Sequence, residues 1–303
     1  MFLFWPMKRR KSDILWKVIM EEVFDDLLRF IMPDADQEYN LERGFEFLEK
    51  ELAEMYPEPE KEPDTRFADK LIKVFNRQGE EDWILVHIEI QGDTSKRVEF
   101  AERMFRYFYR VLDKHRKPVS AVAIFTGLDG KKMPDRYTYQ YRRTRVLYEY
   151  HTLSILDFTD EELKESSNPF ALVVLTAKTA LLEGKIPEQE LLNRKLLIAK
   201  ELLKKGYTEG KVRAIIVFLR SYVLFEDPEM NRIFTEQVRS YDKNNIMGTI
   251  EYVRMEAKEE GRMEKEVSVI LKLLAQPNFS DEQIADIAGV TTAFVEEVRK
   301  NKK

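Results

Sequence analysis

The chain of 303 residues carries 50 lysines and arginines against 55 aspartates and glutamates, which gives a formal net charge of −5 at pH 7. It contains no cysteine, which excludes thiol nucleophiles, disulfides and cysteine-ligated zinc. With only three histidines, any metal chemistry is expected to rest on carboxylates, which favour Mg²⁺ or Mn²⁺. Because the overall charge mildly repels phosphate, contact with nucleic acid would have to come from local basic patches.

The first predicted element is an amphipathic helix over residues 12–32, with Ser12 or Asp13 as its N-cap and Pro33 after its end. The apolar MFLFWP that opens the chain precedes the basic MKRRK, which is the reverse of the order in a secretory signal. No run is long enough to predict a transmembrane helix. We therefore expect a cytoplasmic protein that makes no membrane contact.

A second helix is predicted over residues 41–55, and the proline-rich PEPEKEP ends it. The stretch from Arg66 to Gly92 then predicts a β-hairpin, because KLIKVF alternates apolar and polar residues and WILVHIEI is a longer apolar run. The polar segment between these runs suits a turn centred on Gly79.

If Phe75 and Trp83 are the last pair before the turn, Asp69 lies directly opposite Glu89. Gln91 then follows two residues further along the same face. Like charges placed opposite each other destabilise a sheet unless something binds between them, and a divalent cation is the usual partner. The hairpin therefore predicts a metal site, and its competing interpretation is a pair of ordinary solvent-facing charges.

A helix is expected from about Val98 to His115. Its apolar stripe consists of Phe100, Met104, Phe108, Val111 and Leu112. A second face, at helical spacing, is basic and aromatic and consists of Arg103, Arg106, Tyr107 and Arg110. This face predicts either contacts with phosphate or bracing of the carboxylates, and the simpler alternative is a solvated helix face.

After Pro118, VSAVAIFTG predicts a buried central strand, and one further strand is expected within residues 137–157. From residue 160 onward the pattern is helical. The predicted helices are 169–182, 187–205, 209–225, 228–240 and a long charged run over 246–275. The fold class expected is α+β in the first half, followed by an all-α C-terminal region.

The chain ends in two short predicted helices around a turn at Gly289, the first capped by Ser280, which resemble a helix-turn-helix. Their expected core is Ile284, Ala285, Ile287, Gly289, Val290 and Val295. The second helix carries Glu296 and Glu297, whereas helices that enter the major groove usually present basic or amide side chains. A packing or oligomerisation role is therefore favoured over base recognition.

An acidic residue on the first strand of the hairpin (FADKLIKV) precedes a Glu-x-Gln on the second (LVHIEIQG), with SDILWK before them and FAERMFRYFYRV and KPVSAVAIFTG after them. Together these segments resemble the PD-(D/E)XK nuclease superfamily, specifically the bacterial recombination-promoting nuclease and putative transposase family. The resemblance implies a restriction-endonuclease-like core over 7–160 with a mixed sheet flanked by helices. It leaves 161–245 as a helical extension and 246–303 as a charged helix with the helix-turn-helix-like tail.

The resemblance implies a Mg²⁺-dependent DNA endonuclease, with Mn²⁺ as a substitute for Mg²⁺. Asp69, Glu89 and the backbone carbonyl of Ile90 would hold the ion, which would polarise the scissile phosphate and activate water. Gln91 stands where the superfamily usually has lysine; it would orient water but cannot take a proton. Asp13 matches the acidic helix that opens the family's domain.

Three alternatives stay open. The chain could be a nucleic-acid-binding or protein-interaction protein that keeps the nuclease fold without cleavage, a hypothesis that Gln91 and the acidic net charge support. It could also be a helical scaffold whose second half mediates homo-oligomerisation. Finally, His87 lies on the same strand face as Glu89, and a structural hydrogen-bonding role is the default for it.

Overall fold

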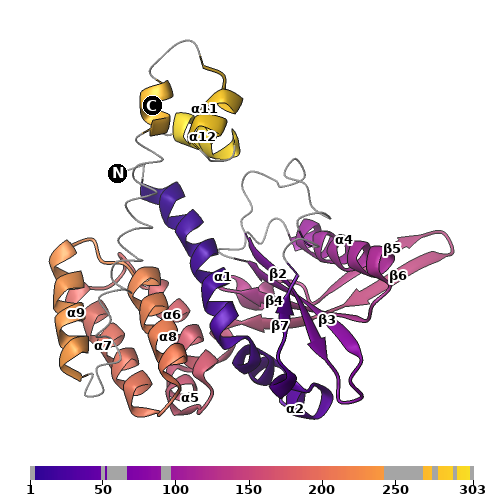
Figure 1. The fold of residues 1–303 in the computed structure, drawn as a ribbon, viewed down its shortest axis with the longest axis horizontal. Coiled ribbons are helices and arrows are strands. Elements are labelled where there is room, and N and C mark those ends of the chain that lie inside the picture. Colours follow the sequence, from indigo (N-terminus) through magenta and orange to yellow (C-terminus); the bar gives the residue numbers. More distant parts are fainter. Residues whose placement is uncertain are drawn as a thin grey trace. The chain divides into compact units, whose positions relative to one another are not determined.

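The computed structural model describes residues 4–48, 52, 67–89, 97–241, 269–274, 279–288 and 292–300. The chain divides into two compact units, one within Ser12–Asn244 and the other formed by Met1–Lys11 with Asn245–Lys303. The larger unit contains a mixed five-stranded sheet with helices on both faces, followed by a helical part (Figure 1). This agrees with the α+β class and the helical second half expected from the sequence.

The sheet has the order β1-β2-β3-β4-β7. β2 pairs antiparallel with β1 and β3, while β3–β4 and β4–β7 are parallel. Its strands are β1 (Glu46–Phe47), β2 (Phe67–Phe75), β3 (Glu81–Glu89), β4 (Val119–Phe125) and β7 (His151–Ser154). β5 (Arg136–Tyr141) and β6 (Thr144–Glu149) form a separate antiparallel pair.

The described helices fall before, within and after the sheet strands. They are α1 (Phe4–Ile31), α2 (Ala35–Glu38), η1 (Leu41–Arg43), α4 (Arg97–His115), η4 (Gly130–Lys132), η5 (Ile155–Asp157), α5 (Asp160–Glu165), α6 (Pro169–Ala180), α7 (Glu188–Lys204), α8 (Glu209–Tyr222), α9 (Pro228–Tyr241), α11 (Asp281–Ala288) and α12 (Thr292–Lys300). Among them, none has the length and apolar character needed to cross a membrane.

Alternate residues of the central strands face opposite sides of the sheet, and each side is covered by one helix. Leu71, Leu85 and Ala123 pack with Met104 and Val111 of α4 in one buried cluster. On the other side, buried Lys70 of β2 forms an ion pair with Glu21 of α1 at 2.5 Å. The odd-numbered residues of these strands therefore face α4, and the even-numbered residues face α1.

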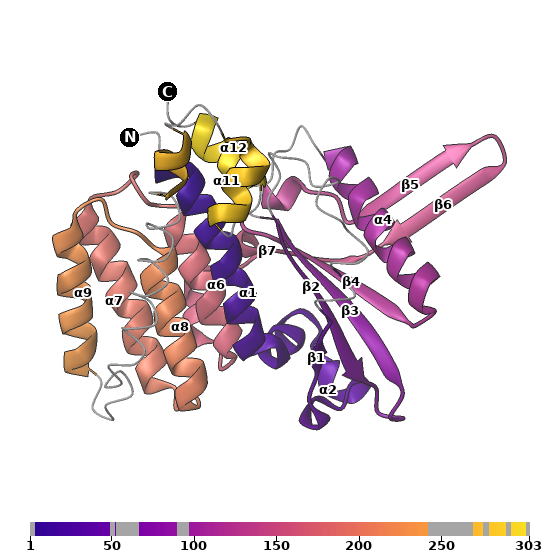
Figure 2. The same ribbon diagram turned by 45° about the horizontal axis from the view of Figure 1, so that its top comes forward.

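Helix α1 also packs against the helical part and therefore lies between it and the sheet (Figures 1 and 2). Trp16 is fully buried, with its ring 5.1 Å from Phe218 of α8 and 5.9 Å from Tyr222. Near the other end of the helix, Phe30 contacts Phe170 of α6 at 5.5 Å. Lys211 of α8 reaches Asp26 at 2.6 Å, so polar contacts reinforce the apolar ones.

Three predictions about the secondary structure of the first half were wrong. Helix α1 begins at Phe4, so Ser12 and Asp13 lie inside it and neither is its N-cap. The helix predicted over 41–55 is wrong for residues 41–48, which form a single 3₁₀ turn followed by β1, because Gly44 takes φ +88° and ends the turn, and Phe47 then packs on Phe24 at 6.0 Å. Leu52 is helical, with its backbone N–H donating to the carbonyl of Leu48, and residues 49–51 and 53–55 lie outside the described part.

The third error concerns residues 137–157, where one strand was predicted and three strands, β5, β6 and β7, occur between residues 136 and 154. The turn between β5 and β6 consists of Arg142 and Arg143, because Tyr141 pairs with Thr144. Two-residue hairpin turns are usually marked by glycine or asparagine. Without that signal, the sequence resembles one long alternating strand.

The smaller unit has its own core of Ile270, Ile284, Ala285, Val295 and Val298. Two short helices at 281–288 and 292–300 confirm the helical pair predicted at the end of the chain. Ile287, however, is 55% exposed and does not belong to the core, contrary to the prediction. Gly289 and Val290 lie outside the described residues, as does most of the charged run 246–275.

Replacing Trp16 by alanine is expected to lower the free energy of unfolding by about 3–5 kcal/mol, because it empties the space between α1 and α8. Urea denaturation followed by circular dichroism measures this. Val18→Ala is the matched control on the same helix, since Val18 is 51% exposed and its truncation should change stability by no more than about 0.5 kcal/mol. Equal effects of the two substitutions would contradict the packing of α1 against the helical part.

Candidate functional site

The register of the β2–β3 hairpin places Asp69 opposite His87 and Phe67 opposite Glu89. The predicted pairing of Asp69 with Glu89 is therefore wrong by two residues. The cause is the turn: Phe75 pairs with Glu81, and the side chain of Asn76 accepts hydrogen bonds from the backbone N–H groups of Gln78 and Glu80. These bonds close residues 76–80 into a tighter loop than the sequence pattern suggested.

A shift of two residues leaves every side chain on its original face, so Asp69, His87 and Glu89 all lie on the side covered by α4. The fully buried His87 stands between the two carboxylates. Its Nδ1 lies 2.5 Å from Asp69 Oδ1, and its Nε2 lies 3.4 Å from Glu89 Oε2. The imidazole therefore bridges the two side chains that were expected to face each other.

Arg103 of α4 completes the group, with its Nη2 2.8 Å from Glu89 Oε2. The basic face predicted on this helix is consequently divided. Arg103 braces a carboxylate, Tyr107 is 8% exposed and belongs to the buried cluster, and Arg106 is exposed and forms an ion pair with Glu102. Arg110 is half-buried. Because Arg103 contacts the sheet, Tyr107 is buried and Arg106 pairs within the helix, these residues do not form a continuous basic surface.

His87 is enclosed by aromatic rings, with ring centroids 5.3 Å from Phe100 and 6.3 Å from Tyr107. Burial lowers the pKa of His87, but the charge of Asp69 and the hydrogen bonds with Asp69 and Glu89 raise it by more, and the charge of Arg103 lowers it slightly. The resulting pKa lies above the ordinary value for histidine. This favours an imidazolium that neutralises charge between the carboxylates.

The backbone at the end of β3 is also held by polar contacts. The carbonyl of Glu89 accepts hydrogen bonds from the backbone N–H of Thr126, at 3.2 Å, and from its hydroxyl, at 3.3 Å. Burial raises the pKa of Tyr222, its hydrogen bonds with Trp16 and Thr126 lower it by less, and the charge of Asp13 raises it further. Asp13 thus acts on Tyr222 through its charge, and Tyr222 is hydrogen-bonded to the Thr126 that donates to the Glu89 carbonyl.

Thr126 and Tyr222 were not singled out in the sequence. Thr126 follows a predicted central strand directly, and a polar side chain at that position is a usable signal, because the carboxyl ends of parallel strands meet at one edge. Tyr222 carries no such signal, since it comes from α8, nearly a hundred residues later in the chain.

The residues described here supply two carboxylates as candidate ligands for a hard cation. His87 contacts Oδ1 of Asp69, and both His87 and Arg103 contact Oε2 of Glu89. The other carboxylate oxygen of each residue, Oδ2 of Asp69 and Oε1 of Glu89, takes no part in these contacts. Within the described residues, no group of three or more histidines, aspartates and glutamates is arranged to hold a metal ion. The other predicted members of the site, Ile90 and Gln91, lie outside the described part.

Comparison of the chain with protein-family models, with curated proteins and with solved structures finds no match. The chemistry of the site must therefore be argued from its own residues.

Replacing Arg103 by methionine is expected to lower the free energy of unfolding by about 3 kcal/mol, because the buried Glu89 then keeps only its longer contact with His87, at 3.4 Å. The double variant Glu89→Gln/Arg103→Met should be less destabilised than Arg103→Met alone, since neither charge then remains. Thermal or urea denaturation measures both changes.

Arg106→Met is the control for this cycle, because Arg106 lies one turn further along α4 and its ion pair with Glu102 is exposed. Its loss should change stability by less than about 0.5 kcal/mol. Additive effects of Glu89→Gln and Arg103→Met would contradict a direct interaction between the two side chains.

Proposed function

We propose that this chain is a metal-dependent nuclease that hydrolyses phosphodiester bonds of DNA, of the PD-(D/E)XK type that its sequence resembles. The observation that carries the proposal is the position of Asp69 and Glu89 on one face of adjacent strands in a mixed sheet, bridged by a buried histidine. Proteins bury several ionisable groups together only at a cost, and such clusters concentrate at functional sites.

In this proposal Asp69 and Glu89 hold Mg²⁺ or Mn²⁺ through Oδ2 of Asp69 and Oε1 of Glu89, the oxygens that take no part in the contacts with His87 and Arg103. When bound, the cation supplies polarisation of the scissile phosphate and activation of a water molecule. His87 and Arg103 restrict the rotamers of the two carboxylates, as partners of metal ligands commonly do. Gln91, two residues after Glu89, orients the attacking water through its amide without taking a proton.

Asp69→Asn and Glu89→Gln are expected to reduce Mg²⁺-dependent cleavage of plasmid DNA by at least about a hundredfold, because each removes one charged ligand while keeping the side-chain volume. Agarose gel assays of supercoiled, nicked and linear DNA measure the loss. Glu80→Gln is the matched control, since Glu80 is an exposed carboxylate at the far end of the same hairpin and should retain full activity.

Metal binding provides a test that does not depend on cleavage. Mn²⁺ should raise the melting temperature of the wild-type protein and of Glu80→Gln, because a ligand that binds only the folded state stabilises it. The increase should disappear in Asp69→Asn. An equal increase in Asp69→Asn would remove Asp69 from the ligand set, and wild-type protein that cleaves no DNA with either metal would overturn the proposed activity.

A second candidate function is favoured by one specific observation. Oε2 of Glu89 contacts both Arg103 and His87, an arrangement that neutralises the carboxylate without any metal. This suits a protein that binds nucleic acid on a nuclease-like fold and does not cleave it. DNA affinity that is equal in EDTA and in Mg²⁺, together with no cleavage over a long incubation, would favour this alternative.

A further inference from the structure

The β5–β6 hairpin leaves the body of the larger unit beside α4 and extends away from the main sheet (Figures 1 and 2). Its strands pair from Arg136–Glu149 at the base to Tyr141–Thr144 at the tip, where Arg142 and Arg143 form the turn. It pairs with no strand of the five-stranded sheet. The hairpin is therefore a two-stranded ribbon.

The base of the hairpin is anchored by aromatic packing on α4. The ring of Tyr137 stacks on Phe105 at 5.0 Å, and the ring of Tyr148 stacks on Phe108 at 4.6 Å. Arg103 of the same helix holds Glu89 in the candidate site. Helix α4 thus connects the hairpin directly to the candidate site.

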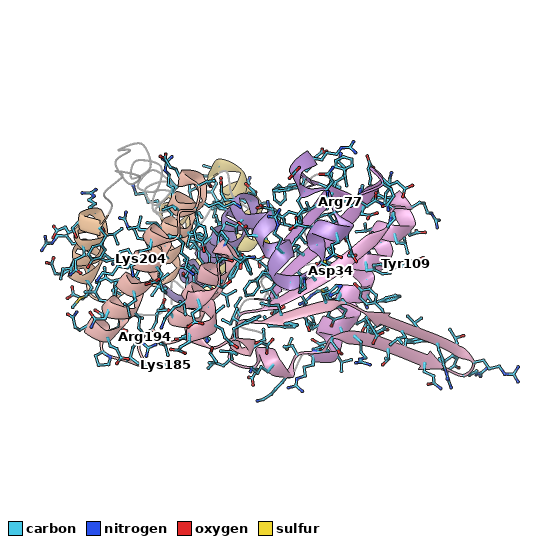
Figure 3. The ribbon with its side chains drawn as sticks, turned by 90° about the horizontal axis from the view of Figure 1, so that it is seen from below. Asp34, Arg77, Tyr109, Lys185, Arg194 and Lys204 are labelled. Carbon is cyan, nitrogen blue, oxygen red and sulfur yellow. The ribbon has the colours of Figure 1, made fainter. Side chains whose placement is uncertain are left out.

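The outer half of the hairpin exposes large side chains that a free ribbon has no structural reason to keep. Tyr139 and Tyr141 are 45% and 58% exposed, and Leu147, nearer the base, is 63% exposed, whereas Tyr148 at the base is buried. The side chains project along the ribbon to its end in Figure 3. Packing within the protein thus accounts for the aromatic residues of the base and not for those near the tip.

The charged side chains of the outer half, residues 139–146, are all positive. They are Arg142, Arg143 and Arg145, and no acidic residue occurs between 137 and 148, in a chain whose net charge is −5. Acidic residues return only at the base, where Asp135 and Glu149 form ion pairs with Arg136. Across the described residues, no carboxylate forms an ion pair with the three arginines of the outer half. The guanidinium of Arg142 lies 5.2 Å from the ring centroid of Tyr141.

The conformation of the turn adds an independent argument. Arg142 has φ +53°, in the left-handed region where glycine or asparagine is the unstrained choice. An arginine in this conformation strains the backbone, and such strain is typical of residues whose side chain has a function.

We propose that the β5–β6 hairpin is an arm that contacts duplex DNA, with Arg142, Arg143 and Arg145 against the phosphates and Tyr139 and Tyr141 against the sugar–phosphate backbone. A two-stranded ribbon has the width that the major groove admits, and arginine and tyrosine are common phosphate contacts. That the ligand is DNA rests on the proposed function, whereas the position of the contact does not depend on metal or cleavage.

The test is the affinity of the full-length triple variant Arg142→Gln/Arg143→Gln/Arg145→Gln for a fluorescein-labelled duplex, measured by fluorescence anisotropy in EDTA. The variant should bind about tenfold more weakly than wild type at low salt. The slope of log affinity against log salt concentration should become shallower by about 2 to 3, because each lost phosphate contact removes about 0.9.

The control is Lys185→Gln/Arg194→Gln/Lys204→Gln, which removes the same charge from exposed side chains of the helical part. Figure 3 labels these three residues on the opposite side of the unit from the hairpin. This variant should keep the wild-type affinity within about twofold, because its charges lie outside the proposed contact. A loss of DNA affinity equal to that of the hairpin variant would mean that only the net charge of the protein matters, and it would overturn the proposal.

Three further outcomes would also overturn it. The first is a hairpin variant that binds duplex DNA as wild type does. The second is a wild-type mass in light scattering that corresponds to a dimer and falls to a monomer in the hairpin variant, which would assign the arm to self-association. The third is stronger binding of single-stranded than of duplex DNA, which would refute the groove contact. The proposed nuclease activity is tested separately. Wild-type protein that binds DNA through the hairpin but does not cleave it would refute the nuclease activity and support the DNA contact of the hairpin.

Discussion

The ion pair between Arg103 and Glu89 ties α4 to the end of β3, and the orientation of the Glu89 carboxylate in the candidate site depends on it. Glu89 is 4% exposed, and a carboxylate is buried at a high cost unless a cation and hydrogen bonds compensate. Arg103 and His87 supply that compensation from two different elements, one from above the sheet and one from within it. These contacts tie the helix to the end of β3 and restrict the orientation of the Glu89 carboxylate.

The same helix serves two surfaces. Its inner side contributes Met104, Tyr107 and Val111 to the core, and its outer side holds the base of the hairpin through Phe105 and Phe108. If the hairpin contacts DNA, a force on the arm acts on the helix that orients Glu89. Substrate binding and the arrangement of the carboxylates are then coupled through one rigid element rather than through a chain of loops.

Strand and helix positions were predictable wherever apolar periodicity was strong, as in β2, β3, α4, β4 and α6 to α9. The side of the sheet that each strand residue faces was predictable as well, and Asp69, His87 and Glu89 share a face as expected. Their pairing was not, because it depends on the hydrogen bonds that Asn76 makes inside the turn. Contacts from distant parts of the chain, such as Tyr222 with Thr126, leave no pattern in local sequence.

Helix α1 has a consequence for how this protein can be divided. Trp16 and Phe30 reach the helices that follow residue 160, while Glu21 and Phe24 on the same helix reach the strands before it. A shortened gene that ended at residue 160 would encode every strand of the sheet and still leave an aromatic side of α1 in water. The sheet and the helical part thus share α1 as a packing partner. Exchange of either part with an unrelated protein would therefore require a redesigned α1 face.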